Sequence, residues 1–316
     1  MIELPQNFFG AFIMTFERPE ILLKSIRNLQ SQTFPPEYIL IVDNSASYDT
    51  QNALKEFISP SLEYYRVGYN SGPAGGASMG LIKVAEKGYQ WIYWGDDDNP
   101  PRNPQVFQDL FSRIRKLEEQ QVNLGIYGGK GGTINKLTGR IRSLKNKDLL
   151  NKDAVEVDMV AGGQTMLVKA VVIRKHILPE ERLFFGFEDL DFSLKVRAAG
   201  FKIFVDAKSW LKARLEFQNS GHNYRPVDSS FGNEKKLIRD YYSNRNLLYI
   251  LLKNKLYFPL SFQLLKSFAK MFWGFKFSGS YGKKNFFFQK KAIQDFFKKD
   301  FSFKETPNKP QEKVSD

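Results

Sequence analysis

The sequence of 316 residues contains no cysteine and only two histidines. Without cysteine the protein has no disulfide framework and no thiolate nucleophile or metal ligand. No apolar stretch approaches the roughly 18 residues that a membrane-spanning helix needs. The longest charge-free run near the C-terminus, residues 256–265, is interrupted by Pro259, and residues 1–7 lack the basic-then-apolar pattern of a signal peptide. We therefore expect a cytoplasmic protein, peripheral at the inner face of the cell membrane rather than crossing it.

Acidic residues are outnumbered, since 34 Asp and Glu stand against 47 Lys and Arg and give a formal net charge of +13. Phenylalanine is abundant, with 29 residues. A strongly basic chain favours an anionic partner, which leaves nucleic acid, an anionic membrane surface and phosphate-rich substrates open. The length allows one large domain, or one domain with an extension.

Strand-like and helix-like patterns alternate over the first hundred residues. Apolar runs typical of buried strands cover residues 8–15, 38–42, 62–67 and 91–94, and helical spacing covers residues 19–30, 50–57 and 74–87. Such alternation predicts a parallel sheet with crossover helices, whose ligands bind beyond the carboxyl ends of the strands. Asp43, the loop at residues 70–76 and the triplet Asp96, Asp97 and Asp98 all fall at such ends.

The Asp96–Asp98 triplet directly follows the fourth of these strands and precedes Asn99, Pro100 and Pro101. Adjacent carboxylates repel one another and are costly to desolvate, and a divalent cation relieves both effects. Hard oxygen ligands suit Mg²⁺ or Mn²⁺. The triplet alone fits a solvated acidic turn about as well as a metal site.

The middle of the chain, residues 125–215, has more strand character and many glycines, among them Gly162 and Gly163 between two strand-like runs. An aromatic and acidic run at residues 184–192 leads into a helix that ends at Gly200. From about residue 234 the chain looks helical, and from Lys253 to Lys304 it alternates Phe with Lys and carries only two acids, Asp295 and Asp300.

The ordered set of motifs resembles the family 2 glycosyltransferases with the GT-A fold, closest to the bacterial rhamnosyl- and galactofuranosyl-transferase branch. The matching pieces lie within residues 8–250 and read TFERP (15–19), VDNS (42–45), NSGPAGG (70–76), DDD (96–98), GFEDLD (186–191) and YSNRN (242–246). The resemblance implies an α/β GT-A catalytic domain over residues 1–250, with a nucleotide-sugar half (1–125) and an acceptor half (126–250). A basic aromatic helical extension over residues 251–316 follows.

The resemblance also implies donor-site residues. Asp43 corresponds to the family's acceptor for the base N3–H, although an Asp at a strand end also starts turns. Nucleotide contacts are implied for Thr15, Arg18, Asn70, Gly75, Gly76 and Asp96. The alternatives are a surface charge for Arg18 and a flexible helix entry for the glycines. Metal ligands are implied at Asp96, Asp98 and His222, with Mn²⁺ or Mg²⁺ as the cofactor, and Asp97 points the other way if the segment stays extended.

On the acceptor side the family's catalytic base corresponds to Asp189. A sugar hydroxyl needs a positioned carboxylate to take its proton as it attacks, and attack opposite the leaving diphosphate inverts the anomeric carbon. Glu188 and Asp191 either bind acceptor hydroxyls or cap the helix that starts there. Arg245 either reaches the diphosphate or forms a salt bridge along its helix.

The leading hypothesis is an inverting, metal-dependent glycosyltransferase that moves galactofuranose or rhamnose from a UDP- or dTDP-sugar to a lipid-linked or polysaccharide acceptor in bacterial surface-glycan synthesis. A sugar-phosphate nucleotidyltransferase is an alternative, but the glycine loop near the N-terminus that such enzymes carry is missing. A non-enzymatic nucleic-acid-binding protein is another, but the sequence has no known nucleic-acid motif and we expect no nucleic-acid partner. The C-terminal extension is expected to pack on the protein, to join a homo-oligomer or to contact an anionic membrane surface.

Overall fold

The computed structural model describes residues 8–163, 165–219, 232–303 and 305. The chain divides into two compact units. The first takes in the described residues of Met1–Thr133, Arg142–Glu181 and Glu188–Asn223. The second takes in those of Ile134–Ile141, Arg182–Phe187 and Tyr224–Asp316.

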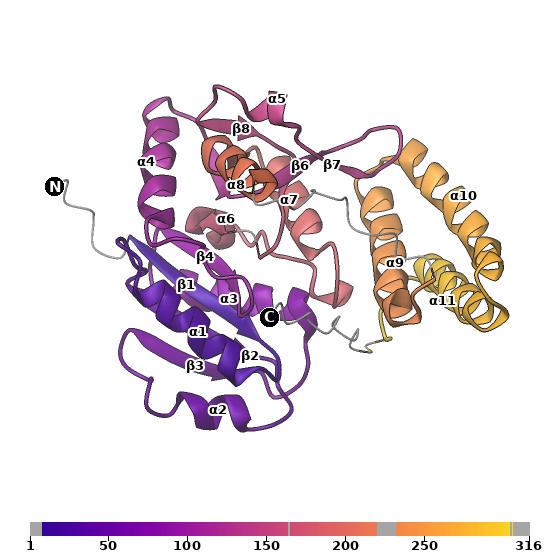
Figure 1. Cartoon of the computed structure of the whole chain (residues 1–316), viewed down its shortest axis with the longest axis horizontal. Coiled ribbons are helices and arrows are strands. Elements are labelled where there is room, and N and C mark those ends of the chain that lie inside the picture. Colours follow the sequence, from indigo (N-terminus) through magenta and orange to yellow (C-terminus); the bar gives the residue numbers. More distant parts are fainter. Residues whose placement is uncertain (1–7, 164, 220–231, 304, 306–316) are drawn as a thin grey trace. The chain divides into compact units, whose positions relative to one another are not determined.

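An eight-stranded sheet forms the centre of the first unit, with strand order β3-β2-β1-β4-β10-β5-β11-β8 (Figure 1). The strands β1 to β4 are parallel, β5 is parallel to β11, and β10 runs antiparallel between β4 and β5. A smaller sheet has the order β7-β6-β9. The predicted strand–helix alternation and mostly parallel sheet are confirmed. The strands are β1 Phe9–Thr15, β2 Tyr38–Asp43, β3 Leu62–Arg66, β4 Trp91–Asp96, β5 Leu124–Gly128, β6 Gly131–Ile134, β7 Ile141–Ser143, β8 Ala154–Glu156, β9 Met159–Val160, β10 Met166–Lys169 and β11 Lys202–Asp206.

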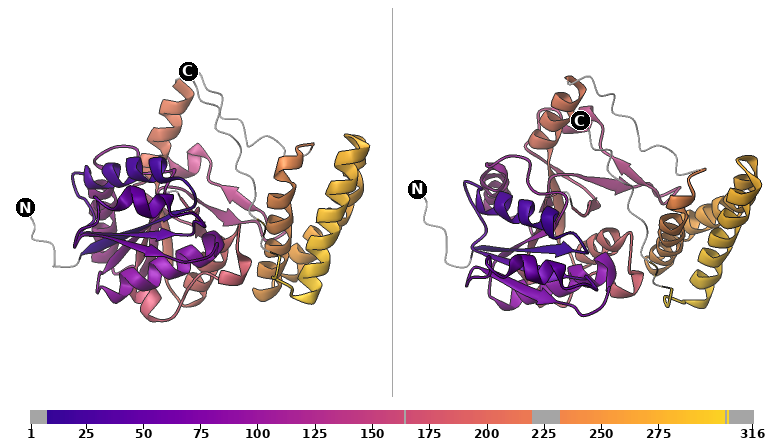
Figure 2. Two further views of the ribbon diagram at one scale, coloured as in Figure 1. Left: turned by 90° about the horizontal axis from the view of Figure 1, so that it is seen from below. Right: turned by 60° about the horizontal axis from the view of Figure 1, so that its bottom comes forward.

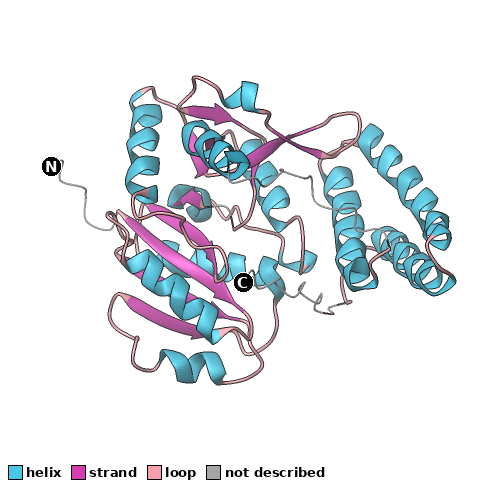
Figure 3. Cartoon of the chain, viewed as in Figure 1, coloured by secondary structure: helices cyan, strands magenta, loops and turns pink. Residues whose placement is uncertain are grey.

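Helices cover both faces of the large sheet, because successive side chains of a strand point to opposite faces. In β1, Phe9, Ala11 and Ile13 pack with one set of helices, α1 (Pro19–Gln30), α2 (Asp49–Leu54) and α4 (Val106–Glu119). Phe12 and Met14 pack with the other set, which includes α3 (Gly72–Glu86), α6 (Ala170–Arg174) and α7 (Glu188–Ala198). The strands between these helices stand out in Figure 3. The first unit also contains the helices α5 (Asn146–Leu149) and α8 (Ala207–Asn219).

The carboxyl ends of the first four strands lie in register at one edge of the sheet. Thr15 pairs with Asp43, Asp43 pairs with Arg66, and Met14 pairs with Asp96. Since β10 runs the other way, the residues that precede its start at Met166 lie at this same edge. The sheet order therefore brings the turn at Gly162 and Gly163 to the end of β4.

The second unit contains three long helices, α9 (Leu237–Lys253), α10 (Tyr257–Trp273) and α11 (Gly279–Lys298), which lie side by side in both views of Figure 2. Three short 3₁₀ helices, η1 (Glu181–Leu183), η2 (Glu234–Lys236) and η3 (Gly274–Lys276), complete the secondary structure of the described residues. Leu248 and Leu251 of α9 share one apolar cluster with Leu260 of α10 and Phe296 of α11.

Because of this shared cluster, the division between the units falls before α9, whereas the sequence places a domain boundary after residue 250. Among the helices described, none combines the length and the apolar content that crossing a membrane requires.

Candidate active site at the carboxyl edge of the sheet

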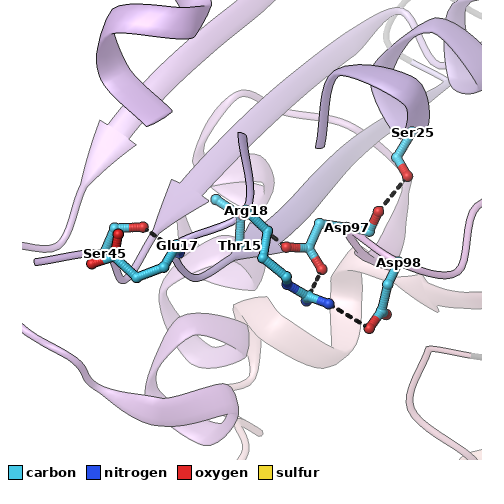
Figure 4. Close-up of polar contacts among 7 residues, drawn as sticks. All are labelled: Thr15, Glu17, Arg18, Ser25, Ser45, Asp97 and Asp98. Atoms are coloured by element: carbon cyan, nitrogen blue, oxygen red, sulfur yellow. Dashed lines mark hydrogen bonds and ion pairs between the residues drawn. The ribbon is translucent and has the colours of Figure 1, made fainter. Parts of the chain in front are cut away.

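Asp97 is fully buried directly beyond the end of β4. Its Oδ2 accepts a hydrogen bond of 2.8 Å from Thr15 Oγ1, and its backbone carbonyl accepts one from Ser25 of α1. The guanidinium of Arg18 forms an ion pair with its Oδ1 (Figure 4). A buried carboxylate needs such partners, because desolvation of an unpaired charge is costly. Thr15, predicted to contact the nucleotide, is itself buried and serves here to hold Asp97.

Arg18 links two members of the aspartate triplet. Its Nη1 lies 2.7 Å from Asp98 Oδ2, while its Nη2 contacts Asp97 (Figure 4). Burial alone lowers the pKa of Arg18, but the hydrogen bond to Asp98 and the charges of both aspartates outweigh burial and raise it. Arg18 is therefore not a free surface cation, and it neutralises part of the negative charge of the triplet.

Asp96 closes β4 and lies against the turn that precedes β10. The position of a Cβ on Gly163 overlaps Asp96 Oδ2, and Gly163 has a positive φ of 66°. The side-chain amide of Asn99 donates to the carbonyl of the same glycine. Only glycine fits here without displacing the Asp96 carboxylate.

The neighbouring residue of the same turn contacts Asp189. The backbone N–H of Gly162 donates to Asp189 Oδ2 at 2.8 Å, and the N–H of Leu190 donates to Oδ1 at 2.7 Å. Burial raises the pKa of Asp189 above the ordinary carboxyl value, although the backbone hydrogen bonds from Gly162 and Leu190 oppose the shift. A raised pKa in a carboxylate at a sheet edge is typical of a group that accepts a proton during a reaction.

One two-residue turn therefore contacts the two carboxylates to which the sequence assigns different roles. Gly163 meets Asp96 and Gly162 meets Asp189. In the sequence this glycine pair stands out only as a break between two strand-like runs, and neither the pair nor Asn99 was predicted to belong to the site. Two adjacent glycines a few residues before a strand, in a chain with acidic motifs on both sides, are the signal in the sequence.

Asp43, the predicted acceptor for the base, is fully buried at the end of β2. Its Oδ1 accepts from the Ser45 N–H at 2.9 Å, and its Oδ2 accepts from the Tyr64 hydroxyl of β3 at 2.8 Å. Burial and the hydrogen bond to Asp43 raise the pKa of Tyr64, which keeps its hydroxyl protonated and donating. The base contact of Asp43 stays a prediction, and the structure adds Tyr64 as the side chain that orients this carboxylate.

The loop before α3 is held by Asn44. Its Oδ1 accepts from the Ser71 hydroxyl at 2.7 Å, and Asn70 accepts from the N–H of Gly72 at 2.9 Å. A Cβ on Gly76 would lie 2.8 Å from the side chain of Asn44, and one on Gly75 would lie 2.6 Å from Ser71. Close packing therefore accounts for both glycines, while their contact with a nucleotide, and that of Asn70, stays a prediction.

Glu17 is a further residue that the sequence analysis did not single out. Its carboxylate accepts from the backbone N–H groups of Ala46 and Ser47, at 2.7 and 3.0 Å, and its own N–H donates to Ser45 (Figure 4). Hydrogen bonds from Ser47 lower the pKa of Glu17, so the carboxylate stays ionised and ties the loop after β2 to the end of β1.

The acidic start of α7 contains one structural residue. Asp191 is buried, lies 2.6 Å from Lys195 and accepts from the Glu180 N–H at 3.1 Å. Asp191 therefore ties α7 to the segment before it rather than capping the helix, and its acceptor contact stays a prediction. Glu188 is half-buried at the first position of α7, and its acceptor contact stays a prediction.

The predicted metal ligands are only partly described. Asp98 is exposed and Asp96 is half-buried, while His222 lies outside the described residues. Within residues 8–163, 165–219, 232–303 and 305, no group of three or more His, Asp or Glu side chains is arranged to hold a metal ion. Of the predicted metal ligands, the described part of the site therefore contains two, the carboxylates of Asp96 and Asp98.

Arg245 of the second unit is fully buried, so a contact with a diphosphate is not supported. It donates to the carbonyl of Leu183 and to Tyr241 Oη, both at 3.1 Å. Its neighbour Asn246 donates to the carbonyls of Leu183, Phe185 and Gly186. Arg245 and Asn246 of the YSNRN motif therefore hold the backbone of residues 183–186.

A mostly parallel α/β sheet with carboxylates at its carboxyl edge and a helical extension is the GT-A class of glycosyltransferase fold. One solved structure, GalNAc-T7 with UDP, GalNAc and Mn²⁺, shares the fold with a TM-score of 0.52 and 13% identity over 77% of this chain and 47% of that one. The profile of glycosyl transferase family 2 matches residues 11–174, just over half of the chain. The protein belongs to glycosyl transferase family 2.

Two curated relatives share a shorter segment. Galactofuranosyltransferase GlfT1 of Mycobacterium tuberculosis is 28% identical over 116 residues, which are 36% of this chain and 38% of that protein. Its counterpart from Mycolicibacterium smegmatis is 31% identical over 106 residues, which are 32% of this chain and 33% of that protein. The match thus spans little more than a third of the length of these relatives.

Proposed function

We propose that the protein transfers a sugar from a nucleotide-sugar donor to a hydroxyl group of a glycan acceptor, with inversion at the anomeric carbon. The single observation that carries this proposal is the Gly162–Gly163 turn, which contacts Asp96 on one side and Asp189 on the other. Family membership favours glycosyl transfer over the nucleotidyl transfer that the sequence left open.

In this reaction Asp189 accepts the proton of the acceptor hydroxyl. The acceptor oxygen forms a bond to the anomeric carbon as the bond from that carbon to the diphosphate breaks, and the nucleoside diphosphate leaves. The raised pKa of Asp189 brings it closer to the working pH, which makes proton transfer from a weakly acidic hydroxyl more effective. The N–H groups of Gly162 and Leu190 keep the carboxylate oriented.

Asp96 and Asp98 fit a role as protein ligands for Mg²⁺ or Mn²⁺. Protein sites for these ions often provide only one or two carboxylates, and substrate phosphates and water complete the shell. A bound ion supplies Lewis-acid stabilisation to the leaving diphosphate. Asp97 is engaged by Thr15 and Arg18, so its buried carboxylate supports the edge rather than coordinating.

The donor and acceptor classes rest on the relatives. Both curated relatives are named galactofuranosyltransferases, and the solved neighbour holds UDP, which favours a UDP-sugar and galactofuranose, with a dTDP-linked rhamnose as the other candidate. The acceptor is a lipid-linked glycan or a polysaccharide of the bacterial surface.

A panel of nucleotide sugars tests this proposal. Titration of UDP-galactofuranose, UDP-galactopyranose and dTDP-rhamnose in the presence of Mn²⁺, followed by incubation with glycan acceptors, should show binding of one donor and a product of inverted anomeric configuration by NMR. A product with retained configuration, or no binding of any nucleotide sugar or free nucleoside diphosphate, contradicts the proposal.

A further inference from the structure

The helix α10 carries its apolar side chains on the outside. All of its exposed positions are uncharged, and seven of the nine are large and apolar: Tyr257, Phe258, Phe262, Leu265, Phe268, Phe272 and Trp273, with Ser261 and Ala269 between them. Leu265 is 71% exposed and Phe258 66%. Phe258, Phe262, Leu265 and Phe272 repeat at helical spacing and form one continuous stripe. We call these seven large residues the α10 aromatic face.

The packed side of α10 is mixed, because the apolar Pro259, Leu260 and Met271 are buried there beside polar residues. Gln263 and Ser267 are buried, and Ser267 donates to Asn244 Oδ1 of α9 at 2.7 Å. Asn244 in turn donates to Gln289 of α11 at 2.9 Å, and Gln263 donates to the carbonyl of Thr138. The two lysines of the helix, Lys266 and Lys270, are half-buried and so are not among its exposed residues.

A helix on a water-facing surface turns its apolar stripe toward the core and polar side chains outward, whereas the outer side of α10 carries more large apolar side chains than its packed side. An exposed apolar patch of this continuity marks an interaction site. Exposure of a large, uncharged apolar surface to water is unfavourable. The pattern therefore indicates that a partner covers the α10 aromatic face and is itself apolar where it meets the helix.

Charge identifies the kind of partner. Residues 253–303 contain eleven lysines and two aspartates. Lys255 and Lys276 are exposed at the two ends of α10, and Lys276 lies 3.7 Å from the ring of Trp273. A second copy of the chain brings the same positive charge against this surface, whereas an anionic bilayer brings opposite charge and an apolar interior together.

We propose that the α10 aromatic face lies in the interface of an anionic phospholipid bilayer, with the helix parallel to the bilayer plane and the lysines at its ends among the headgroups. Tyr257 and Trp273 sit at the first and last positions of α10, as residues with an apolar ring and a polar tip do at membrane interfaces. This inference goes beyond the proposed sugar transfer and does not depend on it.

Tryptophan fluorescence of the intact chain tests the inference directly. Of the four tryptophans, Trp91, Trp94 and Trp210 are buried and Trp273 is 53% exposed, so a change of emission on binding reports the α10 aromatic face. Vesicles of phosphatidylglycerol and phosphatidylcholine should shift the emission to shorter wavelength and sediment the protein. Pure phosphatidylcholine should do so weakly, and added salt should reduce the binding.

Variants at exposed positions distinguish binding through the α10 aromatic face from nonspecific binding by other exposed apolar residues. Leu265→Ser with Phe272→Ser should weaken vesicle binding by about tenfold or more, because the apolar area that enters the bilayer is lost. Phe272→Leu should retain binding. The control pair Ile58→Ser and Leu150→Ser replaces exposed apolar residues of the first unit and should bind like the original chain.

Three results overturn the inference: no sedimentation with anionic vesicles at low salt, equal binding by the Leu265→Ser, Phe272→Ser chain, or a dimer in solution that this double variant dissociates while vesicles bind no protein. The last result assigns the face to a second copy. An Asp189→Asn chain should bind vesicles unchanged, so a failure of the proposed sugar transfer and a failure of this inference are separate outcomes.

Discussion

The three neighbouring aspartates at residues 96–98 lie in three different environments. Asp97 is buried and paired, Asp98 is exposed and shares Arg18, and Asp96 lies against Gly163. Burial of Asp97 is tolerable because Thr15 and Arg18 satisfy both of its oxygens. The sequence identified the triplet as a site and set Asp97 apart from its two neighbours, but it did not show that Arg18 and Thr15, from another part of the chain, hold the Asp97 carboxylate.

The glycine that faces Asp96 gives the first prediction. Gly163→Ala should lower kcat/KM by about 100-fold, because the new methyl group displaces the carboxylate from its position. Two controls separate the causes. Gly162→Ala places its methyl 3.6 Å from Asp189, an ordinary contact, and Gly200→Ala carries the same positive-φ strain with nothing within 4 Å.

Both controls should keep activity within a few-fold of the original protein in steady-state kinetics. Equal activity of Gly163→Ala, or an equal loss in Gly200→Ala, removes the turn from the site.

The raised pKa of Asp189 gives a prediction for the pH dependence. A general base acts in its ionised form, so kcat/KM should fall as pH decreases through the pKa of Asp189. Because burial raises that pKa, the fall should begin above the ordinary carboxyl range near about 4. The same limb should be missing from the residual rate of Asp189→Asn. A rate that stays constant down to ordinary carboxyl values contradicts the assignment.

At the scale of elements, α3 packs against the sheet through a glycine. A Cβ on Gly80 overlaps the ring of Phe12 in β1, so the helix approaches the strand only because this position has no side chain. The sequence showed the glycines of this region but favoured a ligand contact for Gly75 and Gly76. Their packing role became visible only with the sheet in place.

Gly80→Ala should therefore destabilise the protein by about 1–3 kcal/mol, since overpacking outweighs the gain in helix propensity. Gly279→Ala, at the start of α11 with nothing within 4 Å, is the matched control and should leave the free energy of unfolding within about 0.5 kcal/mol. Urea denaturation measures both. If Gly80→Ala leaves the free energy of unfolding unchanged, α3 can shift away from Phe12 without cost, and the prediction is wrong.

Elements with one clear period were predicted well. Helix α1 spans Pro19–Gln30, as the apolar spacing predicted, and the first four strands lie within about two residues of their predicted ends. Sheet order was not predictable in the same way. The placement of β10 between β4 and β5 results from pairing between distant segments, and no local pattern encodes it. The Gly162–Gly163 turn reaches the site only through this order.

At the scale of the whole molecule, helix α9 belongs to the second unit together with α10 and α11. Helix α9 shares an apolar cluster with α10 and α11, and its Arg245 and Asn246 hold the segment from Leu183 to Gly186. Removal of the chain after residue 253 therefore exposes Leu248 and Leu251 and is a poor test of membrane binding. Point variants of the α10 aromatic face are the better choice.

The proposed dependence of nucleotide binding on a metal ion can be tested with a variant of Asp98. Asp98→Asn should make binding of the nucleoside diphosphate independent of Mn²⁺, because one of the two proposed carboxylate ligands is lost. Calorimetric titration of UDP with Mn²⁺ and with excess chelator measures this. Glu56→Gln, an exposed acid elsewhere in the first unit, is the control and should retain the dependence. Binding by Asp98→Asn that still requires Mn²⁺ contradicts the ligand role.

The measurement that tests the central claim most directly compares turnover with donor affinity in Asp189→Asn. Turnover should fall by about 10²–10⁴-fold, while the dissociation constant of the donor stays within about twofold, because the residue acts on the acceptor proton. Ionisation of a carboxylate with a raised pKa costs stability as pH rises, so the variant should melt no lower than the original protein at neutral pH. Undiminished turnover, or lost donor binding in the folded variant, contradicts the assignment of Asp189 as the base.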